Sequence, residues 1–162
     1  MREELTRLGV EELLDITAVD EAFERAETQT TLLIVNSVCG CAAANARPAV
    51  AMAQQAPVQP DRYVTVFAGQ DLEATARARQ FMRGIPPSSP FMALLKGGDP
   101  VFVLERRHIE GRSANAIAMD LVNAYQKYCG TDAQPEGGPE TPEMPERPQA
   151  NNGLPPTFRS FS

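Results

Sequence analysis

The sequence predicts an α/β fold with a central four-stranded mixed sheet flanked by helices, and three observations support it. First, two apolar runs rich in β-branched residues, 31–38 and 62–68, enclose a helix-like stretch at 42–55, which is typical of a parallel β–α–β unit. Second, two later apolar runs, 91–96 and 101–106, are close enough to pair as an antiparallel hairpin. Third, an amphipathic helix closes the pattern.

Helices are predicted before, between and after these strands. Residues 3–14 indicate an N-terminal helical extension with a break at Gly9, and Thr17 to Asp20 resembles a capping box that opens a second helix. Asp71 is expected to cap the next helix, which ends at Gly84. The last helix starts near Ser113. Its apolar stripe has helical spacing and consists of Ala114, Ile117, Ala118, Leu121, Val122, Tyr125 and Cys129.

The chain divides into a folded part, residues 1–130, and an acidic, proline-rich tail, residues 131–162. The tail holds 7 prolines and 5 acidic residues and few apolar side chains. Such a composition cannot bury enough apolar surface to offset the entropy of ordering, so the tail is predicted to be disordered. Its apolar residues, Leu154, Phe158 and Phe161, are the ones that could dock on the domain or on a partner.

Composition excludes some classes of function. With 162 residues, 43% of them hydrophobic and 22% charged, the chain fits one soluble globular domain. The net charge of −6 argues against a nucleic-acid partner. No apolar stretch approaches the roughly 20 residues of a membrane span, and the N-terminus lacks the apolar core of a signal peptide. We therefore expect no membrane association and a cytoplasmic location.

Two cysteines one residue apart, Cys39 and Cys41, are placed for thiol–disulfide chemistry. They follow a predicted strand and precede a predicted helix, with Gly40 between them. A helix N-terminus offers unpaired N–H groups and a positive dipole end, and both favour the nucleophilic thiolate over the thiol. In the cytoplasm such a pair is more often catalytic or metal-binding than a structural bridge.

The arrangement resembles the thioredoxin fold, in which a cis-proline beside the active-site cysteine starts the strand that precedes the hairpin. Here Pro90 opens that strand, so the resemblance implies a cis Ser89–Pro90 bond. The match narrows to the bacilliredoxin family over residues 1–130. The matching segments are Asn36-Ser37-Val38-Cys39-Gly40-Cys41-Ala42-Ala43, Asn45-Ala46-Arg47-Pro48, Pro86-Pro87-Ser88-Ser89-Pro90 and Arg107-His108-Ile109-Glu110-Gly111. Ala44 departs from the family, which often has glycine there.

The resemblance implies a thiol–disulfide oxidoreductase or isomerase that removes the small thiol bacillithiol from S-bacillithiolated proteins. Cys39 would be the nucleophile and Cys41 the resolving thiol. Bacillithiol would be a co-substrate, with no cofactor or metal bound. The partners would be S-thiolated or disulfide-bonded proteins.

Other interpretations of the cysteines remain open. The chain could be a general isomerase or reductase that another thiol serves. It could instead be a non-enzymatic metal-binding or redox-sensing module, in which Cys129 and His108 are the obvious additional soft ligands. The cysteines could also be structural.

Several neighbours of the pair each have two interpretations. Arg47 could supply positive potential near the thiols or recognise a carboxylate of bacillithiol, or it could be an exposed helix arginine. Asn36 and Ser37 could hydrogen-bond a sulfur or cap the helix. His108, the only histidine, is more often a surface or packed residue than a catalytic base. Cys129 is either an inert core thiol or a third redox thiol.

Overall fold

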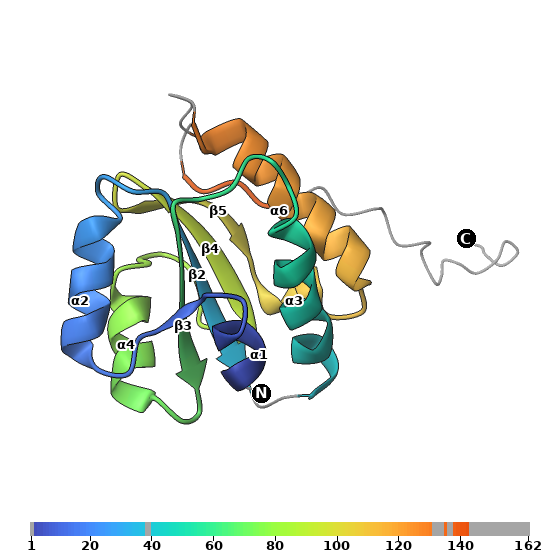
Figure 1. Ribbon diagram of the computed structural model, residues 1–162. Helices are drawn as coiled ribbons and strands as arrows, with labels where there is room; N and C mark the ends of the chain where they lie inside the picture. The colour runs from blue at the N-terminus through green and yellow to red at the C-terminus, as the bar shows by residue number, and fades with distance from the viewer. Residues whose placement is uncertain (1, 38–39, 131–134, 136–137, 143–162) are drawn as a thin grey trace, which may run out of the picture.

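The computed structural model describes residues 2–37, 40–130, 135 and 138–142, with the backbone alone described at residue 2 and residues 40–43. A five-stranded mixed sheet lies between two layers of helices (Figure 1). Its strands are β1 (Glu11–Glu12), β2 (Thr31–Ser37), β3 (Arg62–Ala68), β4 (Phe91–Lys96) and β5 (Asp99–Leu104), in the order β1-β3-β2-β4-β5. The strand β2 runs parallel to β3 and antiparallel to β4.

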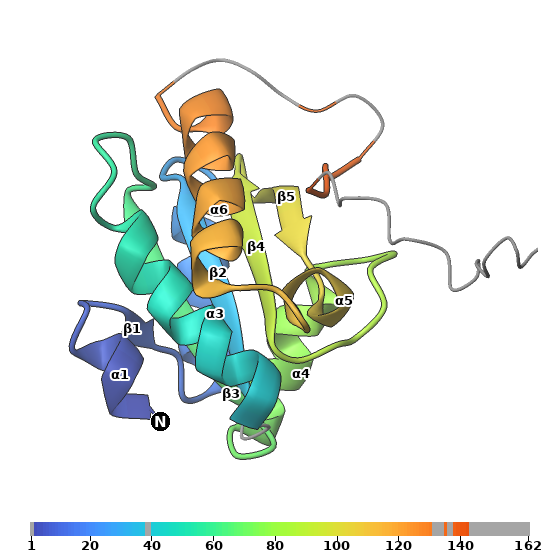
Figure 2. The ribbon, with the colours of Figure 1, turned by 90° about the vertical axis from the view of Figure 1, so that its right-hand side faces the viewer.

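Helices cover both faces of the sheet. The helices α3 (Gly40–Ala53) and α6 (Ala114–Tyr128) lie on one face, where Figure 2 shows them in front of the sheet, while α2 (Ile16–Arg25) and α4 (Leu72–Gln80) lie on the other (Figure 1). Alternate side chains of β2 enter the two resulting cores, Leu32 on the α3 side and Leu33 on the α2 side. All seven residues of β2 are buried, which explains its continuous apolar sequence. Among the described residues, no helix combines the length and apolar character needed to cross a membrane.

This topology confirms the predicted fold class. A parallel β–α–β unit, β2-α3-β3, is followed by α4, by the β4–β5 hairpin and by α6, which is the thioredoxin-like order of elements. The Ser89–Pro90 peptide bond is cis, as the resemblance implied.

The N-terminal segment differs from the prediction of a helix over residues 3–14. The helix α1 (Arg2–Thr6) is short, and the chain turns at Gly9, whose φ of 83° suits glycine. Residues 11 and 12 then pair with β3 as a fifth strand, so that β1 covers the edge β3 would otherwise expose. The next helix also starts earlier than the Thr17 capping box predicted, because Asp15 is the N-cap and accepts a hydrogen bond from the amide of Ala18 at 2.8 Å.

The hairpin also ends differently. The strand β5 stops at Leu104, two residues before the predicted end, and a short helix α5 (Arg106–Ile109) follows. Its cap explains the change of direction, because the backbone N–H of Glu105 donates to Nδ1 of His108 at 2.9 Å. Pro48 lies inside α3, and the helix continues past it to Ala53.

Part of the predicted tail is docked on the domain. The backbone N–H of Glu140 donates to the carbonyl of Val101 at 2.9 Å, and its carbonyl accepts from the amide of Val103 at 2.8 Å. Its carboxylate accepts hydrogen bonds from Lys127 and from the hydroxyl of Tyr128. The prediction of disorder is therefore wrong at Glu140, which extends the sheet at the outer edge of β5. Leu154, Phe158 and Phe161 lie outside the described residues.

The docking of Glu140 is expected to depend on pH. Hydrogen bonds from Lys127 and then from Tyr128 lower the pKa of the Glu140 carboxyl. A lowered pKa means that the contact contributes above the ordinary glutamate value of about 4.3 and is lost as pH falls through the folded-state pKa. We therefore expect Glu140→Gln to reduce the hydrogen-exchange protection of the Val103 amide at pH 7. Glu21→Gln, a change of the same charge on the exposed face of α2, is the control. Unchanged protection in Glu140→Gln would contradict this.

Candidate active site

Three chain segments meet at the edge of the sheet formed by the end of β2 and the start of β4. The strand β2 ends at Ser37, and α3 begins three residues later at Gly40. In the antiparallel pairing of β2 with β4, Val35 lies opposite Phe91, so continuing the register by one residue brings cis-Pro90 to the level of Asn36. The end of β5 lies at the same edge, because Leu104 pairs with Met92. The segments after β2, before β4 and after β5 therefore adjoin.

The two predicted redox cysteines belong to the first of these segments. Cys39 lies outside the described residues, and Cys41 is the second residue of α3, where the backbone alone is described. The helix is 14 residues long and has no acidic residue in its first turn, so nothing there offsets the positive end of its dipole. Cys41 thus belongs to the first turn of α3, and Cys39 directly precedes this helix in the sequence.

Behind this edge, Arg47 and Asn36 form a buried polar contact. The side-chain oxygen of Asn36 accepts from Nη1 of Arg47 at 3.2 Å and from the amide of Ser37 at 2.9 Å. Nε of Arg47 forms an ion pair with Glu4 of α1 at 3.0 Å. Arg47 is only 8% exposed, so the interpretation as an exposed helix arginine is wrong. These contacts join α1, β2 and α3.

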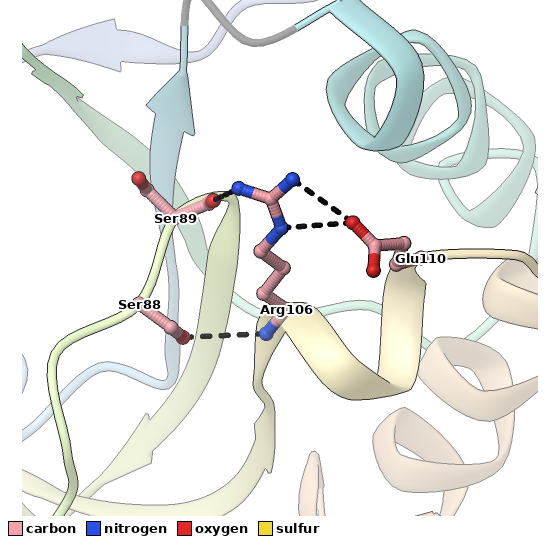
Figure 3. A network of polar contacts seen from close by, with 4 residues as sticks. All are labelled: Ser88, Ser89, Arg106 and Glu110. Atoms are coloured by element: carbon pink, nitrogen blue, oxygen red, sulfur yellow. Dashed lines mark hydrogen bonds and ion pairs between the residues drawn. The ribbon is translucent and has the colours of Figure 1, made fainter.

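The loop that leads to cis-Pro90 is held by two arginines that the sequence analysis did not single out. The backbone N–H of Arg106 donates to the hydroxyl of Ser88 at 3.2 Å, and its Nη1 donates to the carbonyl of Ser89 at 3.4 Å (Figure 3). Nη2 of Arg79 donates to the carbonyl of Ser88 at 3.1 Å. The only sequence signal for Arg106 was its place directly before the family-like segment that starts at Arg107.

His108 is a packed capping residue rather than a catalytic base. Its side chain is buried and its Nδ1 accepts the amide hydrogen of Glu105. Burial, followed by the charge of Arg107, lowers the pKa of the imidazole, so the ring is neutral at physiological pH. It caps α5 and thereby fixes the segment that carries Arg106.

Cys129 lies near the start of β2, at the opposite end of this strand from α3. It is buried at the end of α6, where burial raises the pKa of its thiol and a contact with Thr30 lowers it. Thr30 directly precedes β2, so the length of the strand separates Cys129 from Ser37 at the other end of β2 by roughly 20 Å. The interpretation of Cys129 as a core thiol fits this position.

His108 and Cys129, the additional ligands considered for a metal site, are both buried. Within the part of the chain that the structure describes, no group of three or more His, Cys, Asp or Glu side chains could hold a metal ion.

The chain is similar to several known proteins. The disulphide isomerase family model matches residues 1–129. A bacilliredoxin of Salinibacter ruber is 58% identical over 163 residues, covering 100% of this chain and 94% of its own. A bacilliredoxin of Bacillus cereus is 52% identical over 130 residues, covering 80% of this chain and 90% of its own. The crystal structure of oxidized thioredoxin O2 from Arabidopsis thaliana superimposes with a TM-score of 0.48 at 12% identity, covering 72% of this chain and 94% of that one.

The family match and the relatives together identify the chain as a thiol–disulfide oxidoreductase. The chain belongs to the disulphide isomerase family and, within it, to the bacilliredoxins.

The contact between Arg47 and Asn36 gives a stability prediction. Arg47→Met keeps the aliphatic volume but removes the charged donor, and hydrogen bonds to charged groups contribute about 1.5–3 kcal/mol. We expect the free energy of unfolding, measured by urea titration, to fall by that amount. Arg7→Met removes an arginine whose side chain is 78% exposed, and should change it by less than about 0.5 kcal/mol. Equal effects of the two substitutions would show that the buried contact contributes nothing.

Proposed function

We propose that the protein removes bacillithiol from S-bacillithiolated proteins, with Cys39 as the nucleophile and Cys41 as the resolving thiol. The observation that carries this proposal is the position of the pair. In the sequence Cys39 directly precedes Gly40, the first residue of α3, and this helix follows the end of β2, which lies level with cis-Pro90. The names of the relatives add support for the small thiol.

The proposed reaction consists of two exchanges that balance. The Cys39 thiolate attacks the bacillithiol sulfur of the mixed disulfide, and the protein substrate leaves as a thiolate that takes up a proton. The Cys41 thiolate then attacks Cys39, releases bacillithiol and leaves a Cys39–Cys41 disulfide. Alternatively, the thiolate of a second bacillithiol attacks the bacillithiol sulfur bound to Cys39, so that bacillithiol disulfide forms and Cys39 leaves as a thiolate. The Cys39–Cys41 disulfide needs two electrons from a thiol reductant to reset.

The proposed substrate is a protein. A mixed disulfide on a protein surface needs no deep pocket, because the substrate itself presents the sulfur. We place this activity in the cytoplasm, where low-molecular-weight thiols keep cysteines reduced, and no bound cofactor takes part.

A second candidate is a general disulfide isomerase that uses another small thiol, which the description of the matching family favours. The chemistry at Cys39 is the same in both cases. The two proposals differ in which thiol is found on Cys39 after it has reacted in its native cell.

Single cysteine variants test the proposed roles. Cys39→Ser should abolish the release of bacillithiol from a bacillithiolated protein, because the attacking sulfur is gone. Cys41→Ser should retain the first exchange and accumulate bacillithiol on Cys39, which intact-mass spectrometry detects. Cys129→Ser, which removes a thiol remote from the pair, is the control for loss of a cysteine as such.

Release of bacillithiol by Cys39→Ser at the wild-type rate would contradict the assignment of the nucleophile. A different small thiol on the Cys41→Ser protein recovered from its native cell would favour the general isomerase instead.

A further inference from the structure

Arg106 presents two different faces at the candidate active site. One face holds the loop before cis-Pro90, through the backbone N–H to Ser88 and through Nη1 to Ser89. The other face, formed by Nε and Nη2, binds a single carboxylate oxygen of Glu110 at 3.0 and 2.9 Å. Figure 3 shows the guanidinium between Ser89 and Glu110. The loop contacts fix the position of the charge, and the second face is aimed at a carboxylate.

The contact with Glu110 is one that an incoming ligand can replace. The side chain of Arg106 is 40% exposed and that of Glu110 is 57% exposed, so water and small molecules reach both. The two residues are an i,i+4 pair on the surface, and such pairs are only weakly stabilising. A carboxylate from a ligand can take the place of Glu110 and use both of its oxygens, in the planar two-bond geometry that guanidinium groups favour.

The other arginines of this edge are committed elsewhere. Arg47 is buried and paired with Glu4, so it cannot reach a ligand. Arg79 holds the carbonyl of Ser88. Arg112 donates to Asp120 of α6 and to the carbonyl of His108. Arg107 is 72% exposed, and its Nη2 donates to the carboxylate of Glu105 at 3.4 Å.

We propose that Arg106 is the residue that recognises the carboxylate of a small thiol at this site, with Glu110 as the resident carboxylate that the ligand displaces. The proposal rests on the proposed thiol exchange at Cys39 and names the class of thiol that the site prefers. Thiols and mixed disulfides that carry a carboxylate should react faster than neutral ones of similar size. The sequence analysis considered Arg47 for this role, and the geometry points to Arg106 instead.

The test compares two reagents that differ only in charge. Iodoacetate and iodoacetamide both alkylate the Cys39 thiolate, so the ratio of their rates reports the electrostatic potential at the sulfur and cancels the thiolate fraction. The rates are measured at pH 7 on the full-length, reduced chain carrying Cys41→Ser, with mass spectrometry to confirm the site. Arg106→Gln, Glu110→Gln, Arg106→Lys and the control Arg107→Gln are compared in that background.

The proposal predicts opposite shifts for the two partners of the ion pair. Arg106→Gln should lower the ratio by roughly threefold or more, and Glu110→Gln should raise it by about twofold, because one removes the positive charge and the other removes its counter-charge. Arg106→Lys should keep most of the ratio, and Arg107→Gln should leave it nearly unchanged. All shifts should shrink in 1 M salt, where the screening length is only about 3 Å.

Two results would overturn the proposal. One is a ratio that moves in the same direction in Arg106→Gln and Glu110→Gln, as expected if the pair only supports the loop. The other is a ratio unmoved in Glu110→Gln, a substitution that leaves the loop contacts of Arg106 in place. If the wild-type chain exchanges no thiols with a mixed disulfide, the proposed function itself fails. If it does exchange thiols while the ratios do not separate, only the role of Arg106 fails.

Discussion

The antiparallel pairing of β2 with β4 is the constraint on which the site depends. It sets Val35 opposite Phe91, and thereby brings the end of one strand and the start of the other to the same edge of the sheet. The residues after β2 lead into α3 and the residues before β4 contain cis-Pro90. A slip of one residue would turn every side chain of β2 to the opposite core, so the register is fixed by burial on both faces.

Polar contacts gather at this edge, whereas the interior of the sheet is apolar. Asn36 and Arg47 bind each other behind the cysteines, and His108 caps α5 behind Arg106. Arg112 ties α5 to α6. Buried polar groups stabilise a structure only when their partners are in place, so these contacts specify one arrangement of the loops. These contacts thus fix the loops at the edge of the sheet where we propose that thiols exchange.

The sequence predicted the parts of the fold that apolar patterns encode. The runs at β2, β3, β4 and β5 are continuous and β-branched or bulky, and each lies where the pattern indicated. The sequence did not predict β1, because its two glutamates form no apolar pattern. They form a strand because β3 has a free edge with which they can pair. Nor did the sequence predict the docking of Glu140, which depends on Lys127 and Tyr128 of α6 rather than on its neighbours in the chain.

The candidate site shows the same division. The cysteine pair stands out in the sequence because of its residue type and spacing. Pro90 stands out because of the resemblance to the thioredoxin fold. Arg106 does not stand out, because its partners Ser88 and Ser89 lie 18 and 17 residues away and only the hairpin brings them together. Arg47 was noticed, but whether it was exposed or buried depended on Glu4 of α1, which no local pattern reveals.

We propose that the start of α3 makes the thiol of Cys39 more acidic than a free thiol. The direct measurement is the pH dependence of alkylation of Cys39 in the reduced wild-type chain, followed by peptide mass spectrometry, with the buried Cys129 as the internal reference. We expect the alkylation rate of Cys39 to have its midpoint at or below about pH 7.5, which is a unit or more under the free-thiol value of about 8.5. A midpoint for Cys39 at 8.5 or higher would contradict it.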